Sequence, residues 1–116
     1  MISLTLTYPP SANRLWRNVK GKTLKSGHYR AWLLENRHAG LGLGSIDGPY
    51  ALHVIATAPD RRARDLDNLP KAINDCLQAI GVVANDSNTK RLTIEWGSAP
   101  APGVSIEITP FKPEQA

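Results

Sequence analysis

The sequence predicts a single mixed α/β domain over residues 1–116, with one mixed sheet of about four strands covered by two helices. Alternating apolar and polar residues, which are typical of strands with one buried face, occur at 2–8, 90–96 and 103–109. Residues 49–58 form a fourth segment that is rich in apolar and β-branched side chains and too short for a good helix. Two further segments space their apolar residues as helices do, so the predicted order is β-loop-α-β-α-β-β.

The N-terminal third combines a strand, a long loop and a helix. The strand ISLTLTY ends at a Pro-Pro pair, which cannot continue a ladder of hydrogen bonds. Residues 11–26 are polar, basic and without periodicity, so we expect a long loop there. A helix is expected from 27 to about 41, where the sequence GLGLG ends it. Its apolar stripe comprises Tyr29, Trp32 and Leu33.

The second helix is expected to start near Asn68 and to end at Gly81, a residue favoured just beyond helix C-termini. Pro70 lies in its first turn, where the missing N–H is not needed. The apolar stripe of this helix comprises Leu69, Ala72, Ile73, Cys76, Leu77 and Ile80. The last two strands are joined by a turn rich in Gly, Ala and Pro, and we expect a frayed tail from Pro110 onward.

The charge of the chain favours a polyanionic partner. The net charge is +4, and basic residues concentrate between 14 and 37 and again between 61 and 64. A solvated surface would show the same clusters, so charge alone leaves both interpretations open. The single Cys76 excludes an internal disulfide and suits a reducing compartment. No apolar run approaches the ~20 residues that a membrane span needs, so we expect a cytoplasmic protein.

Two aspartates one residue apart form a candidate metal site. In an extended segment Asp65 and Asp67 would point the same way, with Cα atoms roughly 6 to 7 Å apart. Their mutual repulsion would be relieved by a divalent cation, and oxygen ligands alone select a hard ion such as Mg²⁺. The same spacing also fits a plainer interpretation, in which Asp67 is a helix N-cap and Asp65 a solvated loop acid.

Two further charged residues extend this candidate site. Asp86 lies in the turn-like NDSN after the second helix, and an extended return along that helix would bring it back to the helix start. Lys71 opposes the helix dipole, which favours a role at a phosphate oxygen. Each residue also has an ordinary explanation, Asp86 as a turn acid and Lys71 as the i,i+4 ion-pair partner of Asp75. No Ser-His-acid set, Gly-rich phosphate loop or paired C-x-x-C motif is present.

The stretch PDRRARDLDNLPKAINDCLQAIGVVAND (59–86) resembles the RusA family of Holliday junction resolvases, and YPPSANRLWR (8–17) is similar to that family's N-terminal element. The resemblance implies a homodimeric, Mg²⁺-dependent endonuclease with an α/β fold. Such an enzyme places symmetric nicks in four-way DNA junctions, in DNA recombination and repair. The resemblance also implies that the catalytic acids and metal ligands are Asp65, Asp67 and Asp86, and that the essential lysine is Lys71.

Two positions depart from the family pattern. The family often has two adjacent acids where this chain has Asn85 and Asp86, and Ala63 interrupts its arginine-rich run, which should cost binding rather than chemistry. Two other functions stay open, namely a phage-type nuclease for other branched DNA and a non-catalytic nucleic-acid binding protein. The residues expected to bind DNA are Arg14, Arg17, Lys20, Lys22, Lys25, Arg61, Arg62 and Arg64.

Overall fold

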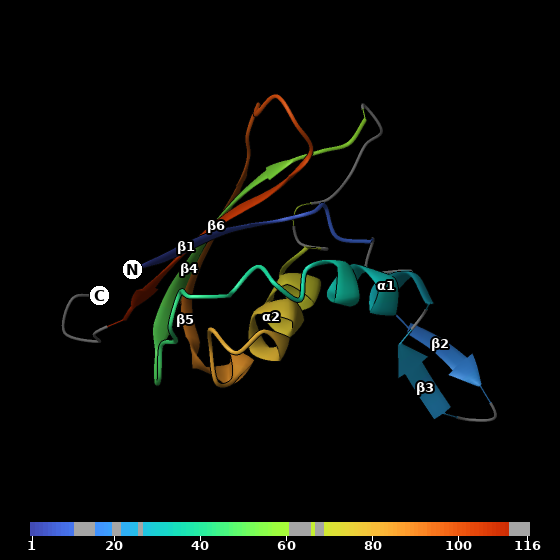
Figure 1. Ribbon diagram of the computed structural model, residues 1–116, viewed down its shortest axis with the longest axis horizontal. Helices are drawn as coiled ribbons and strands as arrows, with labels where there is room; N and C mark the ends of the chain where they lie inside the picture. The colour runs from blue at the N-terminus through green and yellow to red at the C-terminus, as the bar shows by residue number, and fades with distance from the viewer. Residues whose placement is uncertain (11–15, 20–21, 26, 61–65, 67–68, 112–116) are drawn as a thin grey trace.

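The computed structural model of the protein describes residues 1–10, 16–19, 22–25, 27–60, 66 and 69–111. For 16–19 and 22–25 it describes the backbone. Figure 1 shows a twisted sheet on one side of the molecule, two helices against it, and a small hairpin beyond the first helix. None of the helices in the described part of the chain is long and apolar enough to cross a membrane.

Four strands form the main sheet, in the order β1-β6-β4-β5. Strands β4 and β5 are parallel, whereas β6 is antiparallel to both β1 and β4, so the predicted mixed four-stranded sheet is confirmed. Because parallel neighbours cannot be joined by a tight turn, the chain between β4 and β5 crosses over, and helix α2 lies on that crossover. The strands are β1 (Ile2–Leu6), β4 (Tyr50–Thr57), β5 (Thr89–Trp96) and β6 (Gly103–Pro110).

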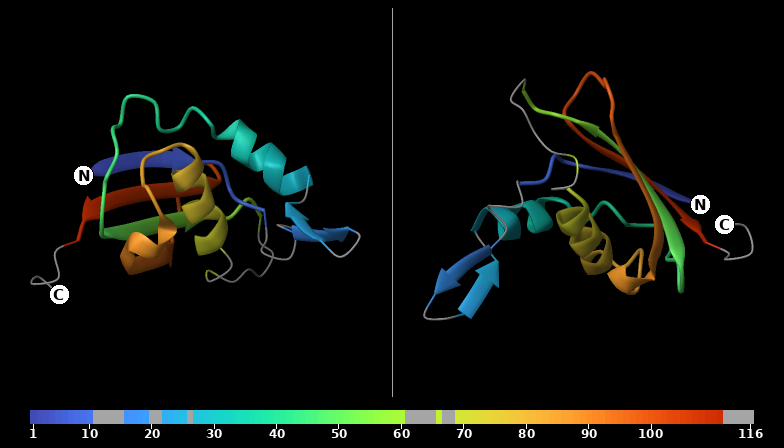
Figure 2. Two further views of the ribbon diagram at one scale, coloured as in Figure 1. Left: turned by 90° about the horizontal axis from the view of Figure 1, so that it is seen from below. Right: turned by 180° about the vertical axis from the view of Figure 1, so that it is seen from behind.

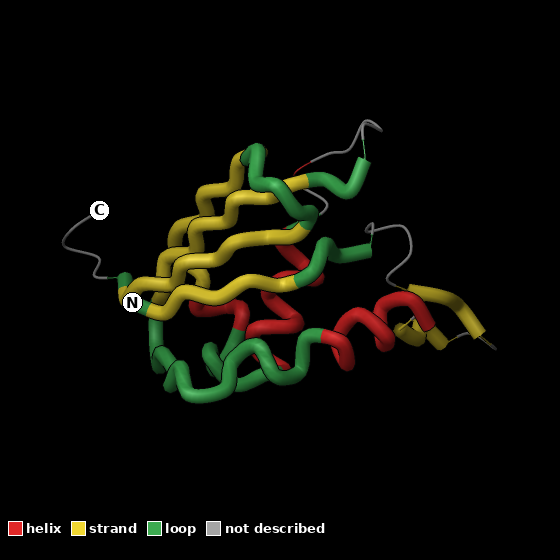
Figure 3. The backbone as a smooth tube through the Cα atoms, turned by 45° about the horizontal axis from the view of Figure 1, so that its top comes forward, coloured by secondary structure: helices red, strands yellow, loops and turns green. Residues whose placement is uncertain are grey.

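Both helices, α1 (Gly27–Glu35) and α2 (Pro70–Ala79), lie on the same face of the sheet (Figures 2 and 3). The alternation along β1, β4 and β6 turns one set of side chains toward the helices, where that set is buried. Helix α2 meets it with an apolar stripe at i, i+3, i+4 spacing, and the predicted core is confirmed at these positions. The buried residues of α2 are Ala72, Ile73, Cys76 and Leu77.

The prediction of a loop at 11–26 was wrong at 16–19 and 22–25, and the rest of that range lies outside the described residues. Strands β2 (Trp16–Val19) and β3 (Lys22–Lys25) pair in antiparallel register from Trp16 opposite Lys25 to Val19 opposite Lys22. Only two residues separate Val19 from Lys22, which is the loop length of the tightest hairpins. A short local hairpin outside the sheet needs no apolar face of period 2, so hydrophobic periodicity did not find it.

Three boundaries also differ from expectation. Helix α1 ends at Glu35 rather than near 41, and the buried Asn36 that follows bonds to the chain just after β1, with its Nδ2 3.0 Å from Thr7 Oγ1. Helix α2 begins at Pro70 rather than near Asn68, with Leu69 at its N-cap position. The chain from Pro110 is not frayed at once, since Pro110 belongs to β6 and the next amide donates to Pro49 O at 3.0 Å.

Candidate active site

The chain that leaves α2 turns back along the helix and brings Asp86 to its first turn. Gly81 has φ of 84°, which ends the helix and reverses the chain. The following Val82 and Val83 are buried, and Val83 forms a parallel bridge with Ile46, so this run is extended. The 3₁₀ turn η3 (Asp86–Asn88) comes next, and the Asp86 Oδ2 atom lies 4.0 Å from Lys71 Nζ. The sequence predicted that Asp86 would come back to the helix start if the chain after the helix were extended, and the chain is extended there.

Polar contacts within the η3 turn fix its backbone and leave the Asp86 carboxylate accessible. The Asp86 amide donates to Gln78 Oε1 at 3.2 Å, and the Ser87 amide donates to Asn85 Oδ1 at 2.9 Å. The Asn85 side chain thus acts as the N-cap of η3, and the position where the family often carries another acid is used here for capping. The Asp86 side chain is 39% exposed, so its carboxylate can reach an external ligand.

Lys71 lies between two carboxylates. Its Nζ is 3.2 Å from Asp75 Oδ1, and this i,i+4 ion pair confirms the ordinary explanation offered for Lys71. Lys71 also lies near Asp86, so it can form this ion pair and still belong to the candidate site. The second oxygen of Asp75, Oδ2, accepts a hydrogen bond from the hydroxyl of Tyr29 on α1. Burial, followed by this bond and the charge of Asp75, raises the pKa of Tyr29 well above its usual value.

A second polar set stands behind the η3 turn and ties α2 to the sheet. The Tyr50 hydroxyl donates to Asn74 Oδ1 at 2.8 Å and accepts from Thr89 Oγ1 at 2.7 Å. Tyr50 is fully buried, and that burial raises its pKa. Because Thr89 begins β5 directly after η3, these bonds hold the backbone that carries Asp86 against the helix.

The two aspartates of the D-L-D sequence, Asp65 and Asp67, lie outside the described residues. Leu66, which separates them, is packed against the core, and its carbonyl accepts from the Leu69 amide at 3.1 Å. Leu66 therefore lies at the entrance to α2, one hydrogen-bonded turn before Leu69. Leu69 occupies the N-cap position of α2 and makes no side-chain capping hydrogen bond, whereas the interpretation of Asp67 as a cap falls outside the described residues.

The chemistry of the described residues fits a hard cation. The available donor at the start of α2 is the Asp86 carboxylate, and no described Cys or His side chain is among its partners. Within the described ranges no group of three acids, cysteines or histidines forms a cluster, and Asp65 and Asp67 lie outside those ranges. A magnesium site would therefore need Asp86 together with the D-L-D carboxylates.

Of the residues expected to bind DNA, the structure gives a position to three. Arg17 lies on β2, and Lys22 and Lys25 lie on β3, so the hairpin carries basic residues on both strands. In Figure 1 this hairpin stands beyond α1, away from the sheet. The other members of the set lie outside the described residues, and they are Arg14, Lys20, Arg61, Arg62 and Arg64.

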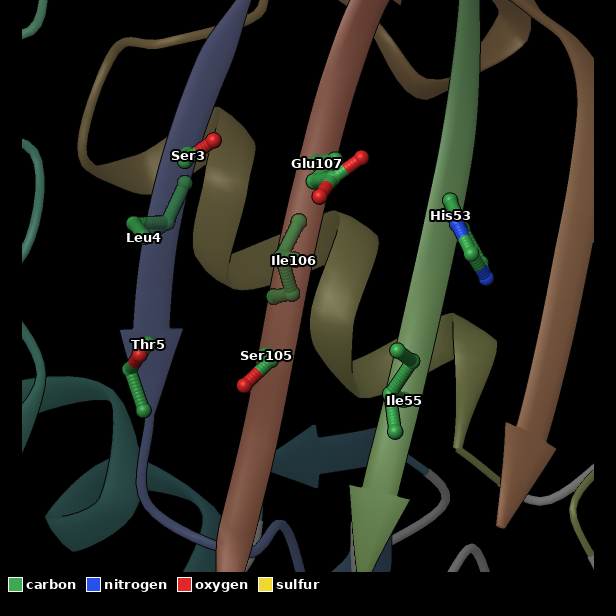
Figure 4. Close-up of a pocket in the computed structure, with 8 residues that line it drawn as sticks. All are labelled: Ser3, Leu4, Thr5, His53, Ile55, Ser105, Ile106 and Glu107. Atoms are coloured by element: carbon green, nitrogen blue, oxygen red, sulfur yellow. The ribbon is translucent and has the colours of Figure 1, made fainter. Parts of the chain in front are cut away.

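The open face of the sheet carries a shallow pocket that is separate from this site. Figure 4 shows its side chains on β1, β6 and β4, with α2 behind the sheet. Among the described residues, none of those predicted for catalysis or DNA binding lines it. Its lining residues are Ser3, Leu4, Thr5, His53, Ile55, Ser105, Ile106 and Glu107.

Sequence reasoning missed one participant and underrated another. Tyr29 was assigned to the apolar stripe of α1, and it is fully buried, but its hydroxyl reaches across 46 residues of sequence to Asp75. Asp75 was identified only as an ion-pair partner. A tyrosine at a core position is the one available signal, because a buried phenol usually finds a hydrogen-bond partner.

Comparison with known proteins gives consistent matches. The family model described as Endodeoxyribonuclease RusA matches residues 7–109. The crossover junction endodeoxyribonuclease RusA of Escherichia coli strain K12 is 36% identical over 91 residues, covering 73% of this chain and 73% of that protein. A protein of the same name from Escherichia coli O139:H28 is 36% identical over 116 residues, covering 92% of this chain and 91% of its own length. The counterpart from Enterobacteria phage 82 is 34% identical over 90 residues, or 72% of each chain.

Proposed function

The chain belongs to the RusA family of endodeoxyribonucleases, and on that basis we propose that it cuts four-way DNA junctions as a crossover junction endonuclease. The observation that carries the proposal is the approach of Asp86 Oδ2 to within 4.0 Å of Lys71 Nζ at the entrance to α2. This approach brings two charged residues that are 15 positions apart together at the first turn of α2, the helix that follows the D-L-D sequence in the chain.

The proposed cofactor is Mg²⁺, held by Asp65, Asp67 and Asp86. When bound, a divalent ion of this kind activates water and stabilises the negative charge that develops on a phosphodiester during hydrolysis. Asp86 supports the assignment because its side chain is 39% exposed and its donor atoms are oxygens, which a hard ion prefers. The backbone of its turn is held by Gln78 and Asn85, so the carboxylate is presented from a fixed position.

The protein's own residues have separate tasks in the proposed reaction. Lys71 places a positive charge beside the phosphate to be cut, and it stabilises charge that develops there. The arginines at 61, 62 and 64 and the basic residues of the β2-β3 hairpin attract the DNA backbone without reading its sequence.

The proposed working state is a homodimer in the cytoplasm. A four-way junction offers two equivalent strands, and paired nicks require two sites related by a two-fold axis. The lone, buried Cys76 suits a reducing compartment. A sedimentation experiment at working concentration that finds only monomer would contradict paired nicking by a preformed dimer.

The direct test is cleavage of a static four-way junction by Asp65→Asn, Asp67→Asn and Asp86→Asn variants. Each variant should lose cleavage in Mg²⁺ while it binds the junction as tightly as the parent chain or more tightly. The matched control is Glu107→Gln, which removes an exposed carboxylate from the far face of the sheet and should cut normally. Full cleavage by any of the three aspartate variants would reject that residue as a ligand.

The same assay separates the remaining alternatives. Flap and linear duplex substrates, run beside the junction, distinguish a junction enzyme from a nuclease for other branched DNA. Binding without metal-dependent cleavage of any substrate would identify a non-catalytic binding protein.

A second test addresses the arginine run. Changing Arg61, Arg62 and Arg64 together to Gln should weaken junction binding and reduce the slope of log K against log salt by up to about 3, since each phosphate contact contributes about 0.9. Binding should be measured by titration at several salt concentrations in EDTA. A slope equal to that of the parent chain would show that these arginines do not contact phosphate.

A further inference from the structure

One carboxylate joins the interior of the protein to Lys71. Asp75 Oδ1 lies 3.2 Å from Lys71 Nζ, and Asp75 Oδ2 accepts from the Tyr29 hydroxyl. The side chain of Lys71 is 55% exposed, that of Asp75 is 17% exposed, and Tyr29 is fully buried. The three groups therefore form a chain that runs from the core beneath α1 to the surface at the start of α2.

An ordinary ion pair would not hold Lys71 in place. Exposed i,i+4 ion pairs are weak, and they stabilise a helix by less than the rotamer entropy that a lysine side chain loses when it is ordered. The first turn of a helix also disfavours a cation, because the N-terminal end of the dipole is positive. A lysine at this position needs an anchor that does not move with it.

Tyr29 makes Asp75 into such an anchor. Hydrogen bonds to an ionised carboxylate are shorter and stronger than neutral ones, and the donor here cannot leave the core. With Oδ2 held by the phenol, Oδ1 stays aimed at the ammonium group. The bond also joins α1 to α2, so the position of Lys71 depends on a helix that lies 36 or more residues earlier in the sequence.

Asp86 cannot serve as this anchor during the reaction. Its Oδ2 lies 4.0 Å from Lys71 Nζ, farther than the 3.2 Å to Asp75, and under the proposed function its carboxylate binds the metal. Among the described acids, Asp75 is then the one that remains paired with Lys71. We infer that Tyr29 and Asp75 are positioning residues, which hold the Lys71 ammonium beside the phosphate that is cut. This inference rests on the proposed role of Lys71 in cleavage.

The test uses Tyr29→Phe, which removes only the buried hydroxyl. Its single-turnover cleavage rate should fall about fivefold to tenfold, while the dissociation constant for the junction stays within twofold of the parent value. The ¹⁵N order parameter of the Lys71 ammonium should also fall in Tyr29→Phe without metal or DNA, with the resonance assigned by its loss in Lys71→Met. The matched control is Thr7→Val, which removes a hydroxyl that holds the residue after α1 and contacts Asn36 rather than Asp75.

Two outcomes would overturn the inference. One is an unchanged Lys71 order parameter in Tyr29→Phe, and the other is a loss of cleavage in Thr7→Val as large as that in Tyr29→Phe. A third result concerns the proposed function instead. Full cleavage by Lys71→Met would reject the catalytic role of the lysine, and the order parameter would still report whether Tyr29 immobilises it.

Discussion

The Tyr50 hydroxyl is the best place to measure what holds the Asp86 turn against the helix. It is fully buried, donates to Asn74 Oδ1 at 2.8 Å and accepts from Thr89 Oγ1 at 2.7 Å. The Tyr50→Phe variant keeps the ring in the core and removes both bonds. The two bonds connect β4, α2 and the first residue of β5, so their loss should appear in global stability.

The expected loss can be worked from the geometry. Each intramolecular hydrogen bond contributes about 1 kcal/mol net, which puts the loss of two bonds near 2 kcal/mol. The Thr89 hydroxyl already lies 3.4 Å from Asn74 Oδ1, so it can turn to this acceptor once the phenol is gone. That replacement recovers part of one bond. The free energy of unfolding of Tyr50→Phe should therefore fall by about 1 to 1.5 kcal/mol.

Urea unfolding at pH 7, followed by tryptophan fluorescence, measures this change. A double-mutant cycle with Thr89→Val isolates the bond between the two hydroxyls, and its coupling energy should be about 1 kcal/mol. A loss below about 0.3 kcal/mol, or additive effects of the two changes, would refute the network.

Two further predictions concern residues around α2. Asn85→Ala should lower the free energy of unfolding by about 1 kcal/mol because the cap of η3 is lost. Asn85→Asp should keep the parent free energy of unfolding, since Asp caps equally well. Equal urea midpoints for the two variants would contradict this prediction. Burial raises the pKa of Cys76 from 9.0 to about 11, so the folded chain keeps the thiol proton after the unfolded chain has lost it. The resulting stability is fully present below pH 9 and falls by about 1.4 kcal/mol per pH unit between 9 and 11. In Cys76→Ala the free energy of unfolding should lack this decrease with pH, as measured by urea titrations at pH 8, 9.5 and 10.5. An equal decrease with pH in the variant and the parent chain would contradict the prediction.

Elements with a strong periodic signal were predicted correctly, because the period follows directly from which face is buried. The strands of the main sheet and the stripe of α2 belong to this class. The β2-β3 hairpin does not, since its four-residue strands carry basic and polar residues without a repeating apolar position. Its pairing is local, so nothing in the wider pattern of the chain marks it.

Among the described residues, the ion pair of Lys71 could be predicted from the sequence, and the contacts that support it could not. Lys71 and Asp75 could be paired from helical spacing alone, whereas the return of Asp86 depended on whether 82 and 83 are extended. Whether these two residues are extended depends on the chain reversal at Gly81 and on the bridge to Ile46. The bridge is a tertiary contact that local sequence patterns do not reveal. The bond from Tyr29 to Asp75 joins two helices, and no local spacing could have found it.

The two described carboxylates near the start of α2 have different partners. This difference decides which of them would repel a bound phosphate. Asp75 accepts a hydrogen bond from Tyr29 and forms an ion pair with Lys71. Asp86 is 39% exposed, and among the described residues the cation near it is Lys71, at 4.0 Å. A bare carboxylate 4 Å from a phosphate charge costs about 1 kcal/mol even at the dielectric constant of water.

Under the proposed function, Asp86→Asn should therefore bind a four-way junction about fivefold more tightly than the parent chain in EDTA. The difference should narrow in Mg²⁺, because the ion neutralises Asp86 in the parent chain and has lost this ligand in the variant. Titrations with and without the metal measure both dissociation constants. Equal affinities in EDTA would show that Asp86 does not lie beside a bound phosphate.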